Sequence, residues 1–235
     1  MKRASDARDD TAESPPLPSR PMTMRIAVAI SGRGSNLQEL LKELGPGASA
    51  EIVLVLSDKA EAPGLHHGRN RGIRVEVLSH SDDADEWLRL LNEHKIDLVV
   101  LAGYLKLVPS GVVAAYRGRI INTHPALLPN FGGKGMYGAR VHQAVLASGA
   151  AESGVTVHLV DEVYDRGAIL AQARVPVLHG DTPEKLASRV LDAEHRLLPR
   201  VVLAAAAAGH PVPLTDPAAG RPEPPARTQS PSYRP

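Results

Sequence analysis

The residues best suited to chemistry lie in residues 122–129 (NTHPALLP), where Asn122 and His124 stand two positions apart. In an extended segment, side chains with this spacing project from the same side. An amide and an imidazole on one side can donate hydrogen bonds to a developing oxyanion, and histidine exchanges protons near neutral pH. Pro125 and Pro129 restrict the backbone around the pair. The stretch therefore indicates an oxyanion site, while a structural role for a lone histidine remains open.

A carboxylate that could orient His124 occurs later in the chain. Asp165 precedes Arg166 and Gly167 in an acidic turn that follows residues 154–160. A carboxylate beside an imidazole fixes the ring and stabilises its charged form. Aspartate is also frequent in turns for local hydrogen-bonding reasons, so both interpretations stand on the residues alone.

A glycine-rich turn at residues 31–36 (SGRGSN) is typical of anion binding. Glycines allow close backbone approach, and the N-terminus of a following helix offers unpaired N–H groups to a phosphate. Gly32 and Gly34 begin a dinucleotide-type pattern, but Leu37 stands where the third glycine would fall and no Walker lysine is present. The turn favours a single phosphate over a dinucleotide. The alternative is a tight turn between strand and helix that binds nothing.

Two further segments are candidate site walls. Residues 102–109 (AGYLKLVP) form an apolar loop with one cation, Lys106, which suits either a flat pocket wall or core packing. Residues 132–138 (GGKGMYG) carry four glycines and indicate a lid or a substrate rim. Glu194 and His195 lie within a helical pattern, where a charged pair is usually solvated. The ten histidines show no metal-ligand spacing, so we predict no metal.

The elements that must position these residues alternate between buried strands and helices. Strands are expected at residues 25–30, 51–56, 72–78, 97–101 and 119–121, and helices at 37–44, around Trp87 after the cap signal at 81–83, and at 182–208. Residues 154–160 and 168–177 have no helix between them and indicate an antiparallel addition. The pattern predicts an α/β fold with one Rossmann-like, open, mostly parallel sheet and helices on both faces. Pro199 should kink or split the last helix.

Composition limits the class of protein. The 235 residues carry a net charge of +1, contain no cysteine and include no apolar run near the length of a membrane span. We expect a cytoplasmic protein without disulfides, Cys-ligated zinc, nucleic-acid partner or membrane partner. Residues 1–23 and the Pro-rich residues 211–235 should be disordered, which leaves one domain at residues 24–210. A docking role for the C-terminal tail is the alternative to an inert one.

Five motifs occur in a fixed order: residues 31–36 (SGRGSN), 101–106 (LAGYLK), 122–129 (NTHPALLP), 154–158 (GVTVH) and 165–167 (DRG). Together they resemble the phosphoribosylglycinamide formyltransferase family over about residues 24–208. The resemblance implies transfer of a formyl group from the co-substrate 10-formyltetrahydrofolate to the amine of glycinamide ribonucleotide (GAR), in de novo purine synthesis and without a metal. It also implies a monomer or a weak homodimer.

The resemblance also implies roles for individual residues. Asn122 and His124 would stabilise the tetrahedral oxyanion, and Asp165 would hold His124 and help move the amine proton through water. The residues implied to bind GAR are Gly34, Ser35, Asn36 and Glu194. Those implied to line the folate pocket are Leu105, Lys106, Leu107, Val108, Asn122, Asp161, Glu162, Val163, Tyr164 and Asp165.

The sequence departs from the family pattern in three places. Residues 82–85 (DDAD) lack a basic residue that some members have there, the loop at 130–138 is longer than a common version, and residues 166–168 (RGA) replace a Gly-Pro ending. A methionyl-tRNA formyltransferase would carry a further C-terminal domain, and a formyltetrahydrofolate deformylase an N-terminal regulatory domain. The remaining alternative is a catalytically silent nucleotide-binding module. The absence of Asn122, His124 or Asp165 would favour this interpretation.

Overall fold

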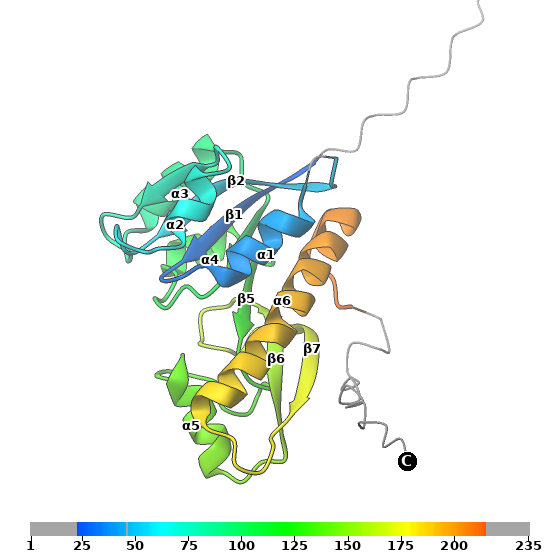
Figure 1. The fold of residues 1–235 in the computed structure, drawn as a ribbon. Coiled ribbons are helices and arrows are strands. Elements are labelled where there is room, and N and C mark those ends of the chain that lie inside the picture. The colour runs from blue at the N-terminus through cyan, green and yellow to red at the C-terminus, as the bar shows by residue number, and fades with distance from the viewer. Residues whose placement is uncertain (1–22, 46, 215–235) are drawn as a thin grey trace, which may run out of the picture.

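A seven-stranded sheet in the order β3-β2-β1-β4-β5-β6-β7 forms the centre of the fold in this computed structural model (Figure 1). The structure describes residues 23–45 and 47–214. Five strands pair in parallel: β1 (Met24–Ile30), β2 (Ala50–Ser57), β3 (Arg74–Val77), β4 (Leu98–Leu101) and β5 (Ile120–His124). The strand order runs outward from β1 in one direction and from β4 in the other. A switch point therefore lies between β1 and β4.

Two antiparallel strands complete the sheet. β6 (Glu152–Leu159) pairs with β5, and β7 (Ile169–Pro176) pairs with β6. In the register of the first pair, Asn122 lies opposite His158 and His124 lies opposite Thr156. The predicted antiparallel addition is confirmed. It brings polar side chains of β6 beside the polar end of β5.

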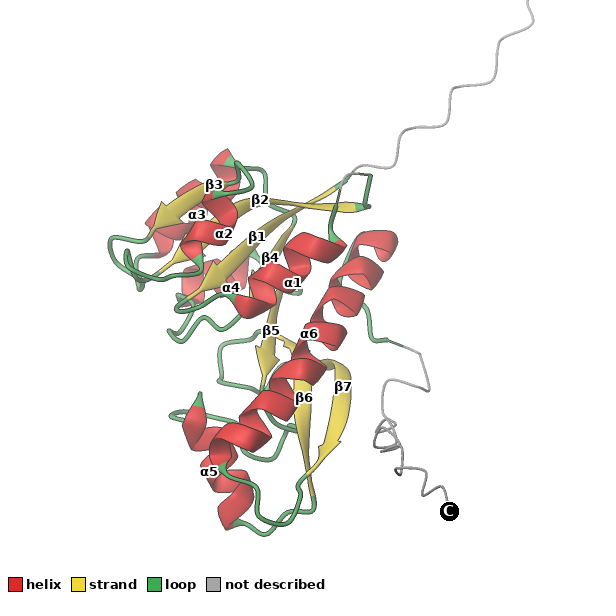
Figure 2. Cartoon of the chain, in the orientation of Figure 1, coloured by secondary structure: helices red, strands yellow, loops and turns green. Residues whose placement is uncertain are grey.

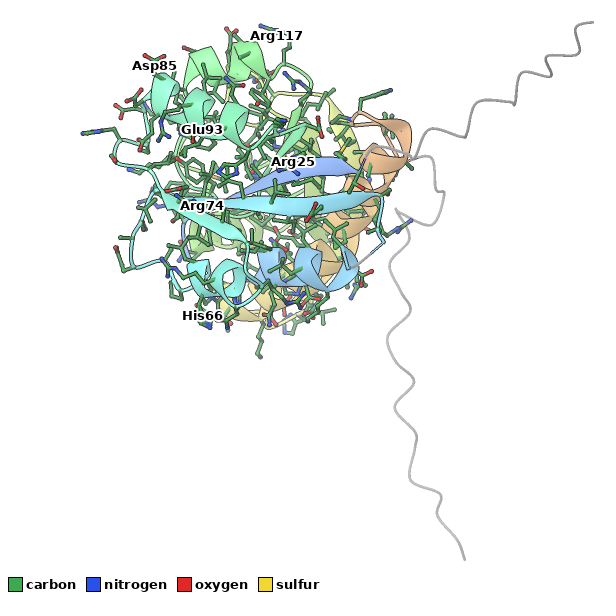
Figure 3. All side chains as sticks on the ribbon, turned by 90° about the horizontal axis from the view of Figure 1, so that it is seen from above. Arg25, His66, Arg74, Asp85, Glu93 and Arg117 are labelled. Atoms are coloured by element: carbon green, nitrogen blue, oxygen red, sulfur yellow. The ribbon has the colours of Figure 1, made fainter. Side chains whose placement is uncertain are left out.

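Helices cover both faces of the sheet (Figure 2). One face carries α1 (Ser35–Glu43), α2 (Leu65–Arg69), α5 (Ala139–Ala147) and α6 (Pro183–Ala208), whose apolar side chains join those of β1 in one core cluster. The other face carries α3 (Ala84–Glu93) and α4 (Ser110–Ala115), packed around the fully buried Trp87. Figure 3 shows His66 of α2 on one side of the strands and Asp85 and Glu93 of α3 on the other.

Local sequence explains where the predicted helices begin. The Asp83 side chain accepts hydrogen bonds from the N–H groups of Asp85 and Glu86, which caps α3. Thr182 accepts from the N–H of Lys185 and caps α6, with Pro183 in the first turn. Both caps agree with the signals in the sequence. α2, α4 and α5 are short helices that the sequence analysis did not locate.

Two expectations about element bounds were wrong. The sequence predicted a kink or a split at Pro199; α6 continues without a break through this residue, so it is not split. Proline removes one helical hydrogen bond, but the buried side chains of Leu198 and Val201 on either side keep both halves packed on the sheet. β5 extends to His124 instead of ending at residue 121. Asn122 and His124 therefore lie on a strand with fixed side-chain directions.

The ends of the chain are described in part. Of the predicted disordered segments, residues 1–22 and 215–235 lie outside the described residues. Within the described part, the N–H of Leu214 donates to the carbonyl of Leu170, at 2.9 Å. Residues just after α6 therefore run beside β7. In residues 23–45 and 47–214, none of the helices is both long and apolar enough to cross a membrane.

Candidate active site

A cavity of about 510 Å³ opens at the carboxyl ends of β1, β4 and β5. It lies at the switch point of the sheet, which is where open α/β sheets bind ligands. Two hydrogen bonds join the loops that follow β1 and β4. The N–H of Ser31 donates to the carbonyl of Gly103, at 3.1 Å, and Ser31 Oγ accepts from the N–H of Leu105, at 2.9 Å. The glycine turn after β1 and the apolar loop after β4 therefore form one continuous wall.

The glycine turn leads into α1 and faces the cavity. Gly34 caps this helix with φ 70°, and a Cβ on it would stand 2.9 Å from the Cα of Gly64. Only glycine combines this left-handed backbone with so close an approach. Gly34, Ser35 and Asn36 all line the cavity at the positive end of the helix dipole. This wall suits an anionic group.

Glu194 belongs to the same wall although it lies far along the chain. Its side chain is buried on α6, where Oε2 accepts from Asn36 Nδ2 at 3.0 Å and Oε1 accepts from Thr123 Oγ1 at 3.3 Å. Burial raises the pKa of this carboxyl, and the two hydrogen bonds oppose the shift. A solvated position, which the helical pattern alone favoured, is wrong for this residue. Sequence also gave no signal for Thr123 as its partner.

Asp165 lies between two histidines at the centre of the cavity. Its Oδ2 is 3.6 Å from His124 Nδ1, and its Oδ1 is 3.5 Å from His158 Nε2. The N–H of Gly133 also donates to Oδ2, at 2.8 Å. Only 9% of the Asp165 side chain and 4% of the His124 side chain are exposed. The structure therefore brings together the carboxylate and the imidazole that the sequence proposed as a pair.

Burial and charge act against each other on this pair. Burial of Asp165 opposes ionisation, but the contacts with His158, His124 and the Gly133 N–H are stronger together and lower its pKa. Burial lowers the pKa of His124, while Asp165 and the carbonyl of Phe131 favour its charged form and His158 disfavours it. The site therefore combines an ionised carboxylate with a histidine that is mainly neutral at pH 7.

Both ring nitrogens of His124 face acceptors. Nε2 lies 2.9 Å from the carbonyl oxygen of Phe131, and because a carbonyl only accepts, Nε2 carries the proton. Nδ1 faces Asp165. Phe131 has a positive φ of 57°, and it belongs to the turn that Gly133 ties to Asp165. A substrate oxygen bound by Nε2 must take the place of the Phe131 carbonyl.

The turn that follows His124 is held by a buried hydroxyl on β6. Thr156 Oγ1 donates to the carbonyl of Ala126 at 2.7 Å and accepts from the N–H of Leu128 and from Gln172 Nε2. Thr156 is fully buried. The hydroxyl therefore satisfies the Ala126 carbonyl and the Leu128 N–H and takes a second hydrogen bond from Gln172, which also donates to the Leu128 carbonyl, so it fixes the path of the chain after β5.

His158 is the polar residue at the centre of the cavity to which the sequence analysis gave no role. Its Nε2 lies 3.1 Å from Asn122 Nδ2, and its ring is 2% exposed. The motif at residues 154–158 contained this histidine, but only the pairing of β6 with β5 reveals which residue it faces. His142 on α5 also lines the cavity without having been expected there, and its buried Nδ1 has no hydrogen-bond partner among the described residues.

The outer part of the cavity is lined by apolar side chains on two loops. Leu105, Leu107, Val163 and Tyr164 line it with 40–57% of their surface exposed. Large apolar residues exposed together are typical of a binding surface. Lys106, Val108 and Asp161 line the cavity as well. Glu162 does not line the cavity; its carboxylate pairs with Arg117, at 3.3 Å.

Comparison with known proteins gives a consistent result. A sequence model described as Formyl transferase matches residues 24–202. The chain belongs to the formyl transferase family. Among curated members, it is 43% identical over 210 residues to the chloroplastic phosphoribosylglycinamide formyltransferase of Arabidopsis thaliana, and 45% identical over 185 residues to that of Vigna unguiculata. These alignments cover 86% and 76% of this chain.

Solved structures of formyl transferases share the fold. The crystal structure of phosphoribosylglycinamide formyltransferase from Brucella melitensis is 47% identical, with a TM-score of 0.71 over 78% of this chain and 96% of that one. The predicted fold class is confirmed. This formyl transferase spans 72% of the length of its Arabidopsis relative and 59% of its Vigna relative. In its residues 23–45 and 47–214, no group of three His, Asp or Glu side chains is placed to hold a metal ion.

Proposed function

We propose that the chain transfers the formyl group of 10-formyltetrahydrofolate to the amine of glycinamide ribonucleotide, giving formyl-GAR and tetrahydrofolate in purine biosynthesis. The observation that carries this proposal is the meeting of Asn122, His124 and Asp165 in one cavity whose inner wall suits a phosphate. Membership of the formyl transferase family supports the reaction class. The names of its relatives in Arabidopsis and Vigna support the acceptor.

The acceptor would occupy the wall made by α1 and α6. Unpaired N–H groups at the start of α1 and the positive end of its dipole favour a phosphate at Gly34 and Ser35. Asn36 and Glu194 hold each other by a hydrogen bond at 3.0 Å, which presents a carboxylate to hydroxyl or amine groups of the acceptor. This wall therefore favours a phosphorylated amine as the formyl acceptor over water, which would be the acceptor in a deformylase.

The folate would occupy the apolar rim. Its aromatic rings suit the exposed side chains of Leu105, Leu107, Val163 and Tyr164, because burying apolar surface contributes about 25 cal/mol per Å². The same rim includes Lys106, Val108 and Asp161. Glu162 was also implied to bind folate, but its contact with Arg117 argues against that role.

The chemistry is a direct transfer without a covalent enzyme intermediate. The amine nitrogen attacks the formyl carbon, and the carbonyl electron pair moves onto the formyl oxygen. When the tetrahedral intermediate collapses, the bond between the formyl carbon and N10 of the folate breaks. One proton leaves the amine and reaches N10, so formyl-GAR and tetrahydrofolate leave with atoms and charge balanced.

Asn122, His124 and Asp165 each have a part in this reaction. An Asn122 N–H and the His124 Nε2–H donate to the oxyanion, once the formyl oxygen has replaced the Phe131 carbonyl at Nε2. As the oxyanion forms, the amine proton reaches Nδ1 of His124 through water, and Asp165 stabilises the charge that the ring gains in this way, since Oδ2 lies 3.6 Å from Nδ1. The lowered pKa keeps this carboxylate ionised while it helps to move the proton, and the proton passes from His124 to N10 of the folate when the intermediate collapses.

An acceptor-dependence assay tests the proposal. Purified chain is mixed with 10-formyltetrahydrofolate, with or without GAR, and release of tetrahydrofolate is followed. Release that requires GAR supports the transferase. Release without GAR would point to a deformylase, and no release in either case would point to a silent binding module.

The remaining expectations concern partners and location. We expect a monomer or a weak homodimer that works on small molecules in the cytoplasm, without nucleic acid or membrane. Sedimentation of the purified chain tests the first point. The two plant relatives are named as chloroplastic, so their names do not support a cytoplasmic location for this chain.

A further inference from the structure

His158 touches two of the three residues assigned to the reaction, although it has no part in the proposed mechanism. Its Nε2 lies 3.1 Å from Asn122 Nδ2 and 3.5 Å from Asp165 Oδ1. The side chain is buried to 3% exposure, yet it lines the cavity. A buried histidine at the reaction centre therefore needs an explanation in terms of its two neighbours.

Its own ring is fixed by the backbone. Nδ1 lies 2.8 Å from the carbonyl oxygen of Leu159, so Nδ1 carries a proton. Asn122 Nδ2 is an amide nitrogen, which only donates, so Nε2 is the acceptor in their contact at 3.1 Å. The Asn122 amide, which is the nearer neighbour of Nε2, must turn its NH₂ group toward His158.

This contact decides what Asn122 presents to the cavity. A side-chain amide has two N–H groups on one side and a carbonyl oxygen on the other. When one N–H binds His158 Nε2, the second remains for an oxygen in the cavity. If the amide rotated by half a turn, it would present its carbonyl, which repels an oxyanion.

We propose that His158 is a positioning residue that holds the Asn122 amide in its donor orientation. The pairing of the strands supports this assignment, because Asn122 and His158 lie directly opposite each other in the ladder between β5 and β6. Thr156, two residues earlier on β6, lies opposite His124 and holds the turn that follows it. β6 thus supports both oxyanion donors of β5. The inference rests on the proposed formyl transfer.

Two substitutions at this position separate positioning from packing. In His158→Asn, the shorter amide reaches the position of Nδ1 and can still donate to Leu159, but no atom remains at Nε2. In His158→Gln, the amide reaches the position of Nε2 and can accept from Asn122. We expect kcat to fall about fiftyfold or more in H158N and less than about fivefold in H158Q, with KM for GAR within threefold in both.

A matched control measures the effect of lost stability alone. Leu91→Ala removes a fully buried side chain around Trp87, on the opposite face of the sheet from α1 and α6. It should lower Tm while kcat stays within twofold of wild type. If H158N and H158Q lost kcat equally, or if H158N kept more activity than H158Q, His158 would not act through Nε2 and the proposal would be wrong.

A double-mutant cycle tests the same point without relying on H158Q. If His158 acts through Asn122, adding H158N to N122A should lower kcat less than threefold, although H158N alone lowers it about fiftyfold. A full fiftyfold further loss would overturn the proposal. Wild-type turnover that depends on GAR establishes the formyl transfer in the same series. Failure of the proposed function would appear as no GAR-dependent wild-type turnover, which differs from either result at His158.

Discussion

Asp165→Asn removes one charge from the centre of the cavity with almost no change in shape. The amide oxygen can still accept from the Gly133 N–H, which donates to Oδ2 at 2.8 Å in the wild type. The turn at residues 131–133 therefore keeps its anchor. What the variant loses is the negative charge 3.6 Å from His124 Nδ1.

The distance sets the size of the effect. At an effective dielectric constant of about 20, unit charges 3.6 Å apart attract by roughly 4–5 kcal/mol. Burial lowers the pKa of His124, so the ring is mainly neutral before reaction and gains charge when it takes up the amine proton as the oxyanion forms. The carboxylate therefore favours the transition state over the ground state. Because each 1.36 kcal/mol corresponds to a factor of ten, this attraction limits the loss in kcat to roughly a thousandfold to five thousandfold, and solvent screening makes the expected loss smaller.

We expect D165N to lower kcat by about a hundredfold to a thousandfold, with KM for both substrates within about threefold. Steady-state release of tetrahydrofolate, with each substrate varied in turn while the other is saturating, measures kcat and both KM values. Glu152→Gln is the matched control, because it removes an equal charge from an exposed pair with Arg174. If D165N retained more than about a fifth of wild-type kcat, the electrostatic role of Asp165 would be refuted.

Three further predictions concern a buried hydroxyl, a surface carboxylate and a buried histidine. Thr156→Val leaves the Ala126 carbonyl and the Leu128 N–H unpaired and removes one of the two hydrogen bonds of Gln172 Nε2, so it should lower the free energy of unfolding by about 2–3 kcal/mol in urea titrations, whereas T156S should cost less than half of that. Glu162→Gln should leave KM for the folate within threefold, because the wild-type carboxylate faces Arg117; a tenfold rise would restore its implied folate role. Burial, and to a smaller extent repulsion from His124, lowers the pKa of His142. The contribution of His142 to stability is therefore complete above about pH 6.5 and is lost as the pH falls. His142→Leu should therefore flatten the loss of Tm between pH 7 and pH 5, and an unchanged slope would contradict this assignment.

The sequence predicted the central strands of the sheet well because β1, β4 and most of β2 are buried on both faces. Runs such as residues 51–56 (EIVLVL) have no solvent-facing alternative, and β2 differs from the expected strand by one residue at each end. The short helices α2 and α4 have five and six residues, which is too short for a helical period to stand out. Pro199 misled the analysis because packing on both sides of a proline cannot be read from a local pattern.

The candidate site was predictable where its chemistry lies within one segment. Asn122 and His124 are neighbours on one strand, and the glycine turn at residues 31–36 precedes a helix, so spacing alone indicated both. Contacts between distant segments were not predictable in this way. The partnership of His158 with Asn122 depends on strand register, and the burial of Glu194 depends on how α6 crosses α1.

The acceptor dependence of turnover tests the central claim most directly. Purified chain with 10-formyltetrahydrofolate should release tetrahydrofolate only when GAR is present, in equal amounts with formyl-GAR, and D165N should abolish most of this release. Release at the same rate without GAR, with formate as the second product, would contradict the account.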